Sequence, residues 1–69
     1  MKGAVKSYDA RRGSGMISRD DGRPDVAVYA NELENAGFAR IENGERLSFD
    51  LKTDLALKRS FAVNLRRIG

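Results

Sequence analysis

Arg12-Gly13-Ser14-Gly15-Met16-Ile17 and, further along the chain, Val26-Ala27-Val28-Tyr29-Ala30 are the stretches that decide the fold. Successive side chains of a strand point to opposite faces, so a strand over 14–19 would place its methionine and its isoleucine on opposite sides. In a strand over 25–30, the two valines share one face and the tyrosine lies on the other. Residues 20–24 between them are dense in turn formers and end in a proline, which cannot donate to a ladder. The pattern predicts two paired strands with one apolar face.

The rest of the chain supplies three more strand candidates. They cover residues 3–8, 47–52 and 60–68, the last two with alternating apolar side chains. Asn31 is expected to cap a short helical turn, and residues 53–58 fit either a loop or a brief helical turn. Phe49 and Phe61 have strand spacing and are expected in the core. Five short strands separated by turn signals predict an all-β, five-stranded antiparallel barrel.

The two glycines of the first stretch have separate folding reasons. Gly13 can support a turn with positive φ, and Gly15 allows a neighbouring backbone to approach closely. Both reasons concern the fold, so the glycines by themselves say little about binding.

Length and composition predict one domain over residues 1–69 and exclude several kinds of protein. The chain has no cysteine for a disulfide and no histidine, which excludes ordinary zinc sites and the usual base–nucleophile pairs. Its aspartates lack calcium-loop spacing, and the sequence has no phosphate-cradling loop. Together with the missing histidine and cysteine, this leads us to expect no metal, no cofactor and no catalytic residues. No stretch approaches the ~20 apolar residues of a membrane span, and the N-terminus lacks a secretion signal. A soluble, cytoplasmic protein that is not an enzyme is expected.

The net charge of +3 is unevenly distributed. Residues 1–23 carry six basic and three acidic groups, and residues 52–69 carry five and one, whereas residues 24–51 carry two and six. If the two ends of the chain lie side by side, they form a basic face suited to a polyanion. A merely solvated surface is the alternative.

The chain resembles a bacterial cold-shock domain over nearly its whole length. The matching segments are Gly3-x-Val5-Lys6, Arg12-Gly13-x-Gly15-x-Ile17, Asp25-Val26-x-Val28, Gly37-Phe38, Ile41-x-x-Gly44-x-x-Leu47-x-Phe49 and Ala62-x-Asn64-Leu65. The resemblance implies an OB-type barrel that binds single-stranded RNA or DNA, stacking bases on aromatic side chains above a basic groove.

The departures from the family pattern concern those aromatic side chains. The family has tryptophan at Ser7 and histidine at Tyr29. It has phenylalanine at four further positions, which in this chain are Ser14, Met16, Ala27 and Ala30. The resemblance leaves Tyr29 and Phe38 as stacking residues, with Tyr8 beside them and Met16 as a polarizable substitute. Phe61 stands where the family carries a polar or small residue near the groove. Base stacking contributes ~1–3 kcal/mol per base, so weak binding is expected.

Charge can compensate for the missing rings. Arginine stacks on bases as well as pairing with phosphates, and each neutralised phosphate adds salt-sensitive affinity. The resemblance places three cations beside the first two strands, namely Lys6, Arg11 and Arg12. It places two more, Lys58 and Arg59, in the loop before the last strand. The expected binding set is therefore Lys6, Tyr8, Arg11, Arg12, Met16, Tyr29, Phe38, Lys58 and Arg59. The alternatives are that Tyr29 merely covers the barrel, that Phe38 is a lid over the core and that the cations are simply solvated.

Two functions follow from this sequence. The first is weak, charge-led binding of single-stranded nucleic acid with low sequence specificity. The second is a protein-interaction module, in which small residues on the thinned surface let a protein partner approach closely; these residues are Ser7, Ser14, Ala27 and Ala30.

Overall fold

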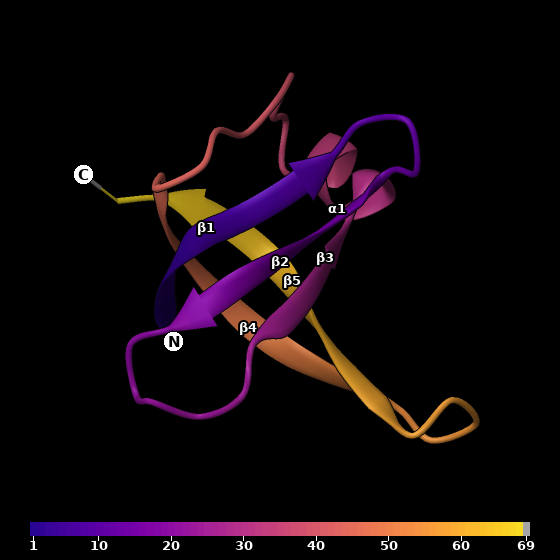
Figure 1. Ribbon diagram of the computed structural model, residues 1–69. Coiled ribbons are helices and arrows are strands. Elements are labelled where there is room, and N and C mark those ends of the chain that lie inside the picture. The colour runs from indigo at the N-terminus through magenta and orange to yellow at the C-terminus, as the bar shows by residue number, and fades with distance from the viewer. Residues whose placement is uncertain (69) are drawn as a thin grey trace.

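Five strands and one short helix make up the described residues, 1–68, of the computed structural model (Figure 1). They are β1 (Lys2–Asp9), β2 (Ser14–Arg19), β3 (Val26–Tyr29), α1 (Ala30–Asn35), β4 (Arg46–Asp54) and β5 (Arg59–Arg67). The expected all-β, five-stranded barrel is confirmed. Of the expected 1–69 domain, Gly69 lies outside the described residues.

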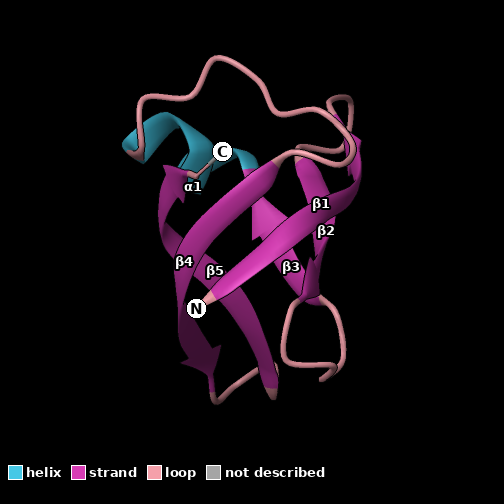
Figure 2. Ribbon diagram, turned by 90° about the vertical axis from the view of Figure 1, so that its left-hand side faces the viewer, coloured by secondary structure: helices cyan, strands magenta, loops and turns pink. Residues whose placement is uncertain are grey.

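The strands form a closed barrel in the order β1-β2-β3-β5-β4. Over residues 1–68, every neighbouring pair is antiparallel except β3 and β5, which run parallel and pair at Ala27 and Phe61. The purely antiparallel expectation is wrong for this pair, because the chain crosses over through α1 and β4 before β5 returns beside β3. Figure 2 shows α1 and the long loop after it at one end of the barrel, and the β4–β5 turn at the other.

The core follows the predicted alternation in β2, β3 and β4. Both valines of β3 are buried and its Ala27 and Tyr29 are partly exposed, as expected. Phe49 of β4 is buried, which confirms its predicted place. The buried apolar side chains in the described part of the chain are Val5, Ile17, Val26, Val28, Leu33, Ile41, Leu47, Phe49, Ala62 and Leu65.

The prediction that Phe61 lies in the core is wrong. In β5 the buried side chains are Ala62 and Leu65, so the two-residue alternation is interrupted between them. The interruption is a bulge: Asn64 has a φ of 52°, and the register with β4 shifts between Ser48 and Asp50. An extra residue in a strand turns everything on one side of it to the opposite face. Phe61 therefore lies on the outside of the barrel.

The start of α1 also differs from the prediction. Asn31 lies inside the helix, and the N-cap residue is Tyr29, which makes no side-chain capping bond within the described chain. The helix begins directly at the end of β3, where the Ala30 N–H donates to the Gly13 carbonyl at 2.9 Å. This tertiary bond sets the boundary two residues before the expected cap.

The segment left open between loop and helical turn is a hairpin turn. β4 continues to Asp54, and residues 55–58 form the turn that leads into β5. The Asp54 Oδ1 accepts hydrogen bonds from the Ala56 and Leu57 N–H groups at 2.9 and 3.2 Å. An aspartate that accepts from the backbone two residues on is a common turn device.

Both glycine predictions are confirmed. Gly13 has a φ of 69°, and a Cβ on Gly15 would collide with the Ser7 carbonyl and with Tyr8 of β1. Among residues 1–68, no helix is long and apolar enough to cross a membrane.

Candidate nucleic-acid interface

One outer face of the barrel gathers aromatic and sulfur-containing side chains from three strands. Met16 of β2 pairs with Ala27 of β3, and Ala27 pairs in turn with Phe61 of β5. The ring of Tyr29 lies beside that of Phe61, with centroids 5.8 Å apart and an interplanar angle of 66°. This edge-to-face arrangement is favourable for aromatic pairs. Both side chains are only partly buried, so the pair is accessible to a ligand.

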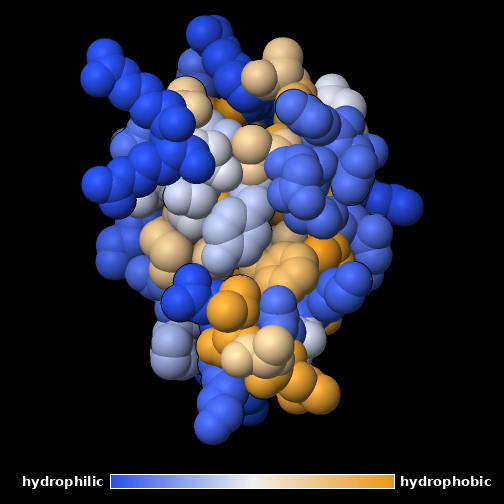
Figure 3. Space-filling view, turned by 90° about the vertical axis from the view of Figure 1, so that its right-hand side faces the viewer, coloured by the Kyte–Doolittle hydropathy of each residue, from blue (hydrophilic) through white to orange (hydrophobic). Residues whose placement is uncertain are grey.

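A hollow of about 420 Å³ lies over these two rings. We call it the ring hollow; it is lined by Gly13, Tyr29, Ala30, Asn31, Asp54, Leu57, Arg59 and Phe61. Figure 3 shows a strip of pale and orange side chains that crosses the middle of this side and reaches its lower end, with blue side chains around it. The lower end is that of the β4–β5 turn in Figure 1. Flat apolar rings bordered by hydrophilic groups form a surface on which bases can stack.

A second hollow of about 500 Å³ continues from the first. We call it the arginine hollow; it is lined by Met16, Arg19, Arg23, Pro24, Asp25, Val26, Ala27, Arg59 and Ser60. Arg59 lines both hollows, so they are neighbours along β2, β3 and the start of β5, and we call the two together the groove. The groove thus offers rings at one end and three guanidinium groups at the other.

A hollow of similar size, about 570 Å³, lies between α1 and the strands β4 and β5. Its lining includes Glu32 and Asp50 beside Arg66, and its one aromatic residue, Phe49, is buried. Since it offers neither an accessible ring nor a surplus of positive charge, it is poorly suited to a polyanion.

The turn between β1 and β2 stands at the rim of the ring hollow, which Gly13 helps to line. The Asp9 Oδ1 accepts from the backbone N–H groups of Arg11 and Arg12 at 2.9 and 3.3 Å. The turn backbone is thereby fixed while both arginine side chains extend into solvent. The Arg12 side chain is 84% exposed, and its Nε lies 3.8 Å from the Asp9 Oδ2, a loose ion pair.

The cations of the groove differ in how far they are already paired. Within residues 1–68, no carboxylate lies within ion-pair distance of Arg11, Lys58 or Arg59. Lys6 is partly neutralised, since its Nζ lies 2.9 Å from the Asp25 Oδ2. An unpaired cation can neutralise a phosphate without first giving up a protein partner, so the first three are the better phosphate ligands.

Arg19 is the most buried of the arginines that line the groove. Its side chain is 10% exposed, and its Nη2 donates to the Asp21 Oδ2 at 2.5 Å. This hydrogen bond, helped by one from the Arg23 N–H, lowers the pKa of the Asp21 carboxyl. The buried Nε has no hydrogen-bond partner in the described chain. Arg19 thus lines the arginine hollow with one buried N–H that is unpaired within the described chain.

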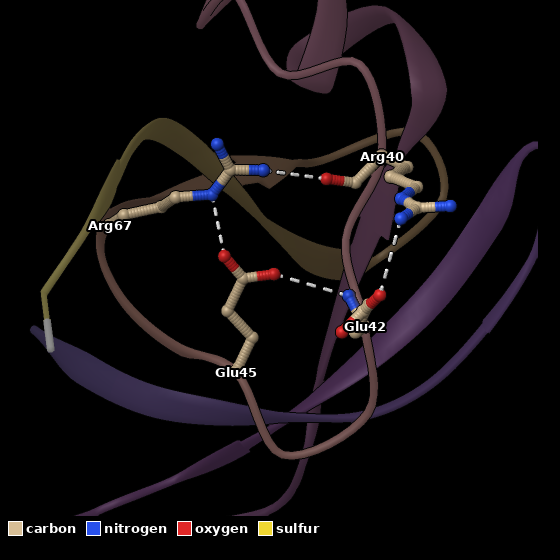
Figure 4. Close-up of polar contacts among 4 residues, drawn as sticks. All are labelled: Arg40, Glu42, Glu45 and Arg67. Atoms are coloured by element: carbon tan, nitrogen blue, oxygen red, sulfur yellow. Dashed lines mark hydrogen bonds and ion pairs between the residues drawn. The ribbon is translucent and has the colours of Figure 1, made fainter.

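Away from the groove, two arginines form ion pairs with acidic residues. Arg46 forms two hydrogen bonds to the Asp20 carboxylate, and these raise the pKa of the Arg46 guanidinium. Arg67 donates to the Glu45 Oε2 at 2.5 Å and to the Arg40 carbonyl at 2.7 Å (Figure 4). The same Glu45 accepts from the Glu42 N–H through its Oε1 at 3.1 Å. These contacts tie the loop after α1 to the end of β5.

Phe38 belongs to this tied loop and not to the ring hollow. Its ring packs against the hydrophobic core, and the Arg67 guanidinium carbon lies 4.4 Å from its centroid. One face of the ring is therefore covered by a cation–π contact. Tyr8 likewise packs against the core, opposite Gly15 in the β1–β2 pairing.

The model of the 'cold-shock' DNA-binding domain matches residues 1–68. The chain belongs to the cold-shock domain family. It is 38% identical to the cold shock protein CspA of Rhizobium meliloti, over 93% of each chain. It is also 32% identical to a cold shock-like protein of Aquifex aeolicus, over 99% of this chain and 94% of the relative. A probable cold shock protein of Sinorhizobium fredii, y4cH, is 36% identical over 93% of each chain.

In this cold-shock domain, the predicted binding residues divide into three groups. Met16, Tyr29 and Arg59 line the groove. The cations at its edges are Lys6, next to Asp25 of the arginine hollow, Arg11 and Arg12 in the turn before Gly13, and Lys58 in the turn before Arg59. Tyr8 and Phe38 pack against the core, and neither lines the ring hollow or the arginine hollow.

Sequence reasoning missed several residues that line the groove of this cold-shock domain. The most important is Phe61, and the others are Arg19, Arg23, Asn31, Asp54 and Leu57. The signal for Phe61 was its position, near the groove by resemblance to the family, which strand alternation then overrode. The remaining residues gave no signal, since they lie at element ends, in the helix and in turns, and approach the groove only through the tertiary fold.

Proposed function

We propose that this cold-shock domain binds single-stranded RNA or DNA along the groove formed by the ring and arginine hollows. The observation that carries the proposal is the accessible Tyr29–Phe61 ring pair, bordered by Arg59 and by further cations that have no ion pair in the described chain. A base stacks on the rings, while the phosphates on either side of it are neutralised by arginine and lysine. Phe61 supplies a ring on a face where the family's rings are largely replaced.

The energetics of this arrangement indicate weak binding with a large electrostatic share. Two accessible rings supply ~1–3 kcal/mol per stacked base. Phosphate contacts add affinity that falls steeply with salt and carries no sequence information. We therefore propose a charge-led binder whose sequence specificity is low over most of the strand.

The test is fluorescence anisotropy of a labelled short oligothymidine and of the corresponding oligouridine, at low and moderate salt. We expect saturable binding to both at low salt and a marked loss of affinity as salt increases. The same oligothymidine annealed to its complement is the control, and it should bind more weakly because its bases are paired. An absence of saturable binding to either single strand at low salt would overturn the proposal.

A second candidate, a protein-interaction module, is favoured by one observation. Leu55 and Leu57, in the turn between β4 and β5, are 83% and 62% exposed. Two exposed leucines on a projecting turn offer apolar area to a protein partner, and Leu57 lines the ring hollow together with the small residue Ala30. Recovery of a stoichiometric partner from nuclease-treated lysate, lost when both leucines are replaced by serine, would support this function. Recovery of nucleic-acid-dependent partners only would speak against it.

A further inference from the structure

We propose that the ring hollow accepts one unpaired guanine base and that Asp54 recognises its edge. This inference rests on the proposed function, since it assigns a base preference to one position of the bound strand. The remaining positions of the strand are held without a preference, by stacking and charge.

The ring hollow has the composition of a base-binding site. Tyr29, Phe61 and Leu57 give it apolar walls, and its volume is about 420 Å³. Besides the tyrosine, three of its side chains can form hydrogen bonds: Asn31, Asp54 and Arg59. Apolar walls with few polar groups are typical of sites that orient a planar ligand, and unpaired bases are recognised by hydrogen bonds at their edges.

Asp54 is the member of this set that distinguishes between bases. Its side chain is half-buried, and its Oδ1 is occupied by the Ala56 and Leu57 N–H groups. Its Oδ2 has neither a hydrogen-bond partner nor a cation within ion-pair distance in the part of the chain that is described. A carboxylate in a groove for a polyanion repels the phosphates, so it favours binding only where the ligand presents donors to it.

Guanine is the base that presents such donors side by side. Its N1–H and N2–H₂ groups are adjacent, and the two lone pairs of a carboxylate oxygen can accept from both. Adenine and cytosine offer one amino group next to a ring nitrogen acceptor, and thymine and uracil offer one imino group between two carbonyls. Each of those four bases therefore offers the carboxylate oxygen a single donor group, whereas guanine offers two. The guanine O6 can meanwhile accept from Arg59, which lines the same hollow.

The experiment compares three otherwise identical oligothymidines, with thymine, guanine or inosine at one central position. Inosine keeps N1–H and O6 but lacks the N2 amino group. We expect the protein to bind the guanine strand about tenfold more tightly than the all-thymine strand, which is at the lower end of the discrimination that a specific base contact provides. The affinity for the inosine strand should lie between these two. Because this comparison uses the unaltered protein, it does not depend on any variant folding.

The variant Asp54→Asn then tests the assigned residue. Asparagine keeps an oxygen that can accept from Ala56 and Leu57, but it replaces the free carboxylate oxygen with an amide donor. We expect its guanine-to-thymine affinity ratio to fall to about one, a loss of about tenfold. The matched control is Asp50→Asn, an exposed acid on the same strand that bonds to Asn64 outside the groove, and it should keep the preference.

The outcomes separate this inference from the proposed function. Binding of all strands with no guanine preference overturns the inference and leaves the proposed function standing. Persistence of the preference in Asp54→Asn overturns the role of Asp54. Failure to bind any of the three strands at low salt overturns the proposed function itself.

Discussion

At the scale of single residues, the position of a ring decides its role. Tyr29 and Phe61 stand on the outer face and line the ring hollow, whereas Phe38 packs on the core beneath Arg67. All three are aromatic residues at or near positions where the family contacts nucleic acid. The structure nevertheless gives the first two an accessible surface and the third a covered one, which leads to opposite predictions for substitution.

Replacing Phe61 by alanine should weaken oligothymidine binding at every salt concentration. The loss of one stacking surface corresponds to ~1–3 kcal/mol, roughly five- to 150-fold in Kd. Phe61 is only partly buried, so the free energy of unfolding should change less than for a core substitution. Anisotropy titrations at two salt concentrations measure the affinity, and unchanged Kd values would remove Phe61 from the interface.

Phe38→Ala should instead lower the stability of the barrel. The substitution removes core contact and the Arg67 cation–π contact, which we expect to cost about 1–3 kcal/mol in the free energy of unfolding. Urea denaturation measures this loss. A larger effect on oligonucleotide affinity than that of Phe61→Ala, with stability unchanged, would contradict the placement and restore the ring to the binding surface.

At the scale of elements, close approaches and irregularities in the strands set the shape of the groove. Gly15 lets β1 and β2 approach, and the bulge at Asn64 turns Phe61 outward. The sequence predicted the first, because the pattern of glycines in a strand has a direct steric reason. It did not predict the second, since a bulge depends on how β5 pairs with β4, and regular alternation placed Phe61 in the core.

Gly15→Ala should destabilise the β1–β2 pair. Its Cβ would overlap the Ser7 carbonyl, a backbone atom that cannot rotate away, and overpacking of this kind costs about 1–3 kcal/mol. Gly22→Asn is the control, because that position has a φ of 78° with open space around it, and asparagine tolerates this conformation. Urea midpoints for the two variants should differ clearly, and equal midpoints would contradict the steric reason.

The Arg19–Asp21 hydrogen bond in the loop after β2 should make the stability of the folded state depend on pH. The Arg19 hydrogen bond lowers the pKa of Asp21 from its ordinary value of 3.8, so the carboxylate stabilises the folded state above that value. The contribution is lost as the pH falls through the folded pKa. The difference in melting temperature between the protein and Asp21→Asn should therefore be present at pH 7 and shrink below pH 3.8. A difference that is constant with pH would exclude this linkage.

At the scale of the whole molecule, basic residues from the two positively charged parts of the chain meet at the arginine hollow, which Arg19, Arg23 and Arg59 line. Basic residues from the β1–β2 turn and from the start of β5 border one groove, while others, such as Arg46 and Arg67, are paired with acids elsewhere. The sequence predicted the barrel, most of its core and the cations around the groove, because these follow from local pattern and from family resemblance. It could not predict which cations are paired, since ion pairs such as Arg46–Asp20 join residues far apart in the chain.

Arg12→Ala should reduce the salt dependence of binding. If Arg12 contacts one phosphate of a single strand, the slope of log K against log salt should become less negative by about 0.7, with similar losses on different sequences. Arg46→Ala removes an equal charge that is paired outside the groove and should leave the slope almost unchanged. Equal slopes for the protein and Arg12→Ala would exclude the phosphate contact.

The parallel pairing of β3 and β5 also bears on how the barrel opens. These strands pair at one position, Ala27 with Phe61, whereas β4 and β5 pair along most of their length. Such a seam joins parts of the chain that are distant in sequence, so we expect it to form late in folding and to open early in native-state fluctuations. The groove lies across this seam. A bound strand that contacts both sides would hold β3 and β5 together. It should slow hydrogen exchange there and raise the melting temperature further as the concentration of free strand rises above Kd.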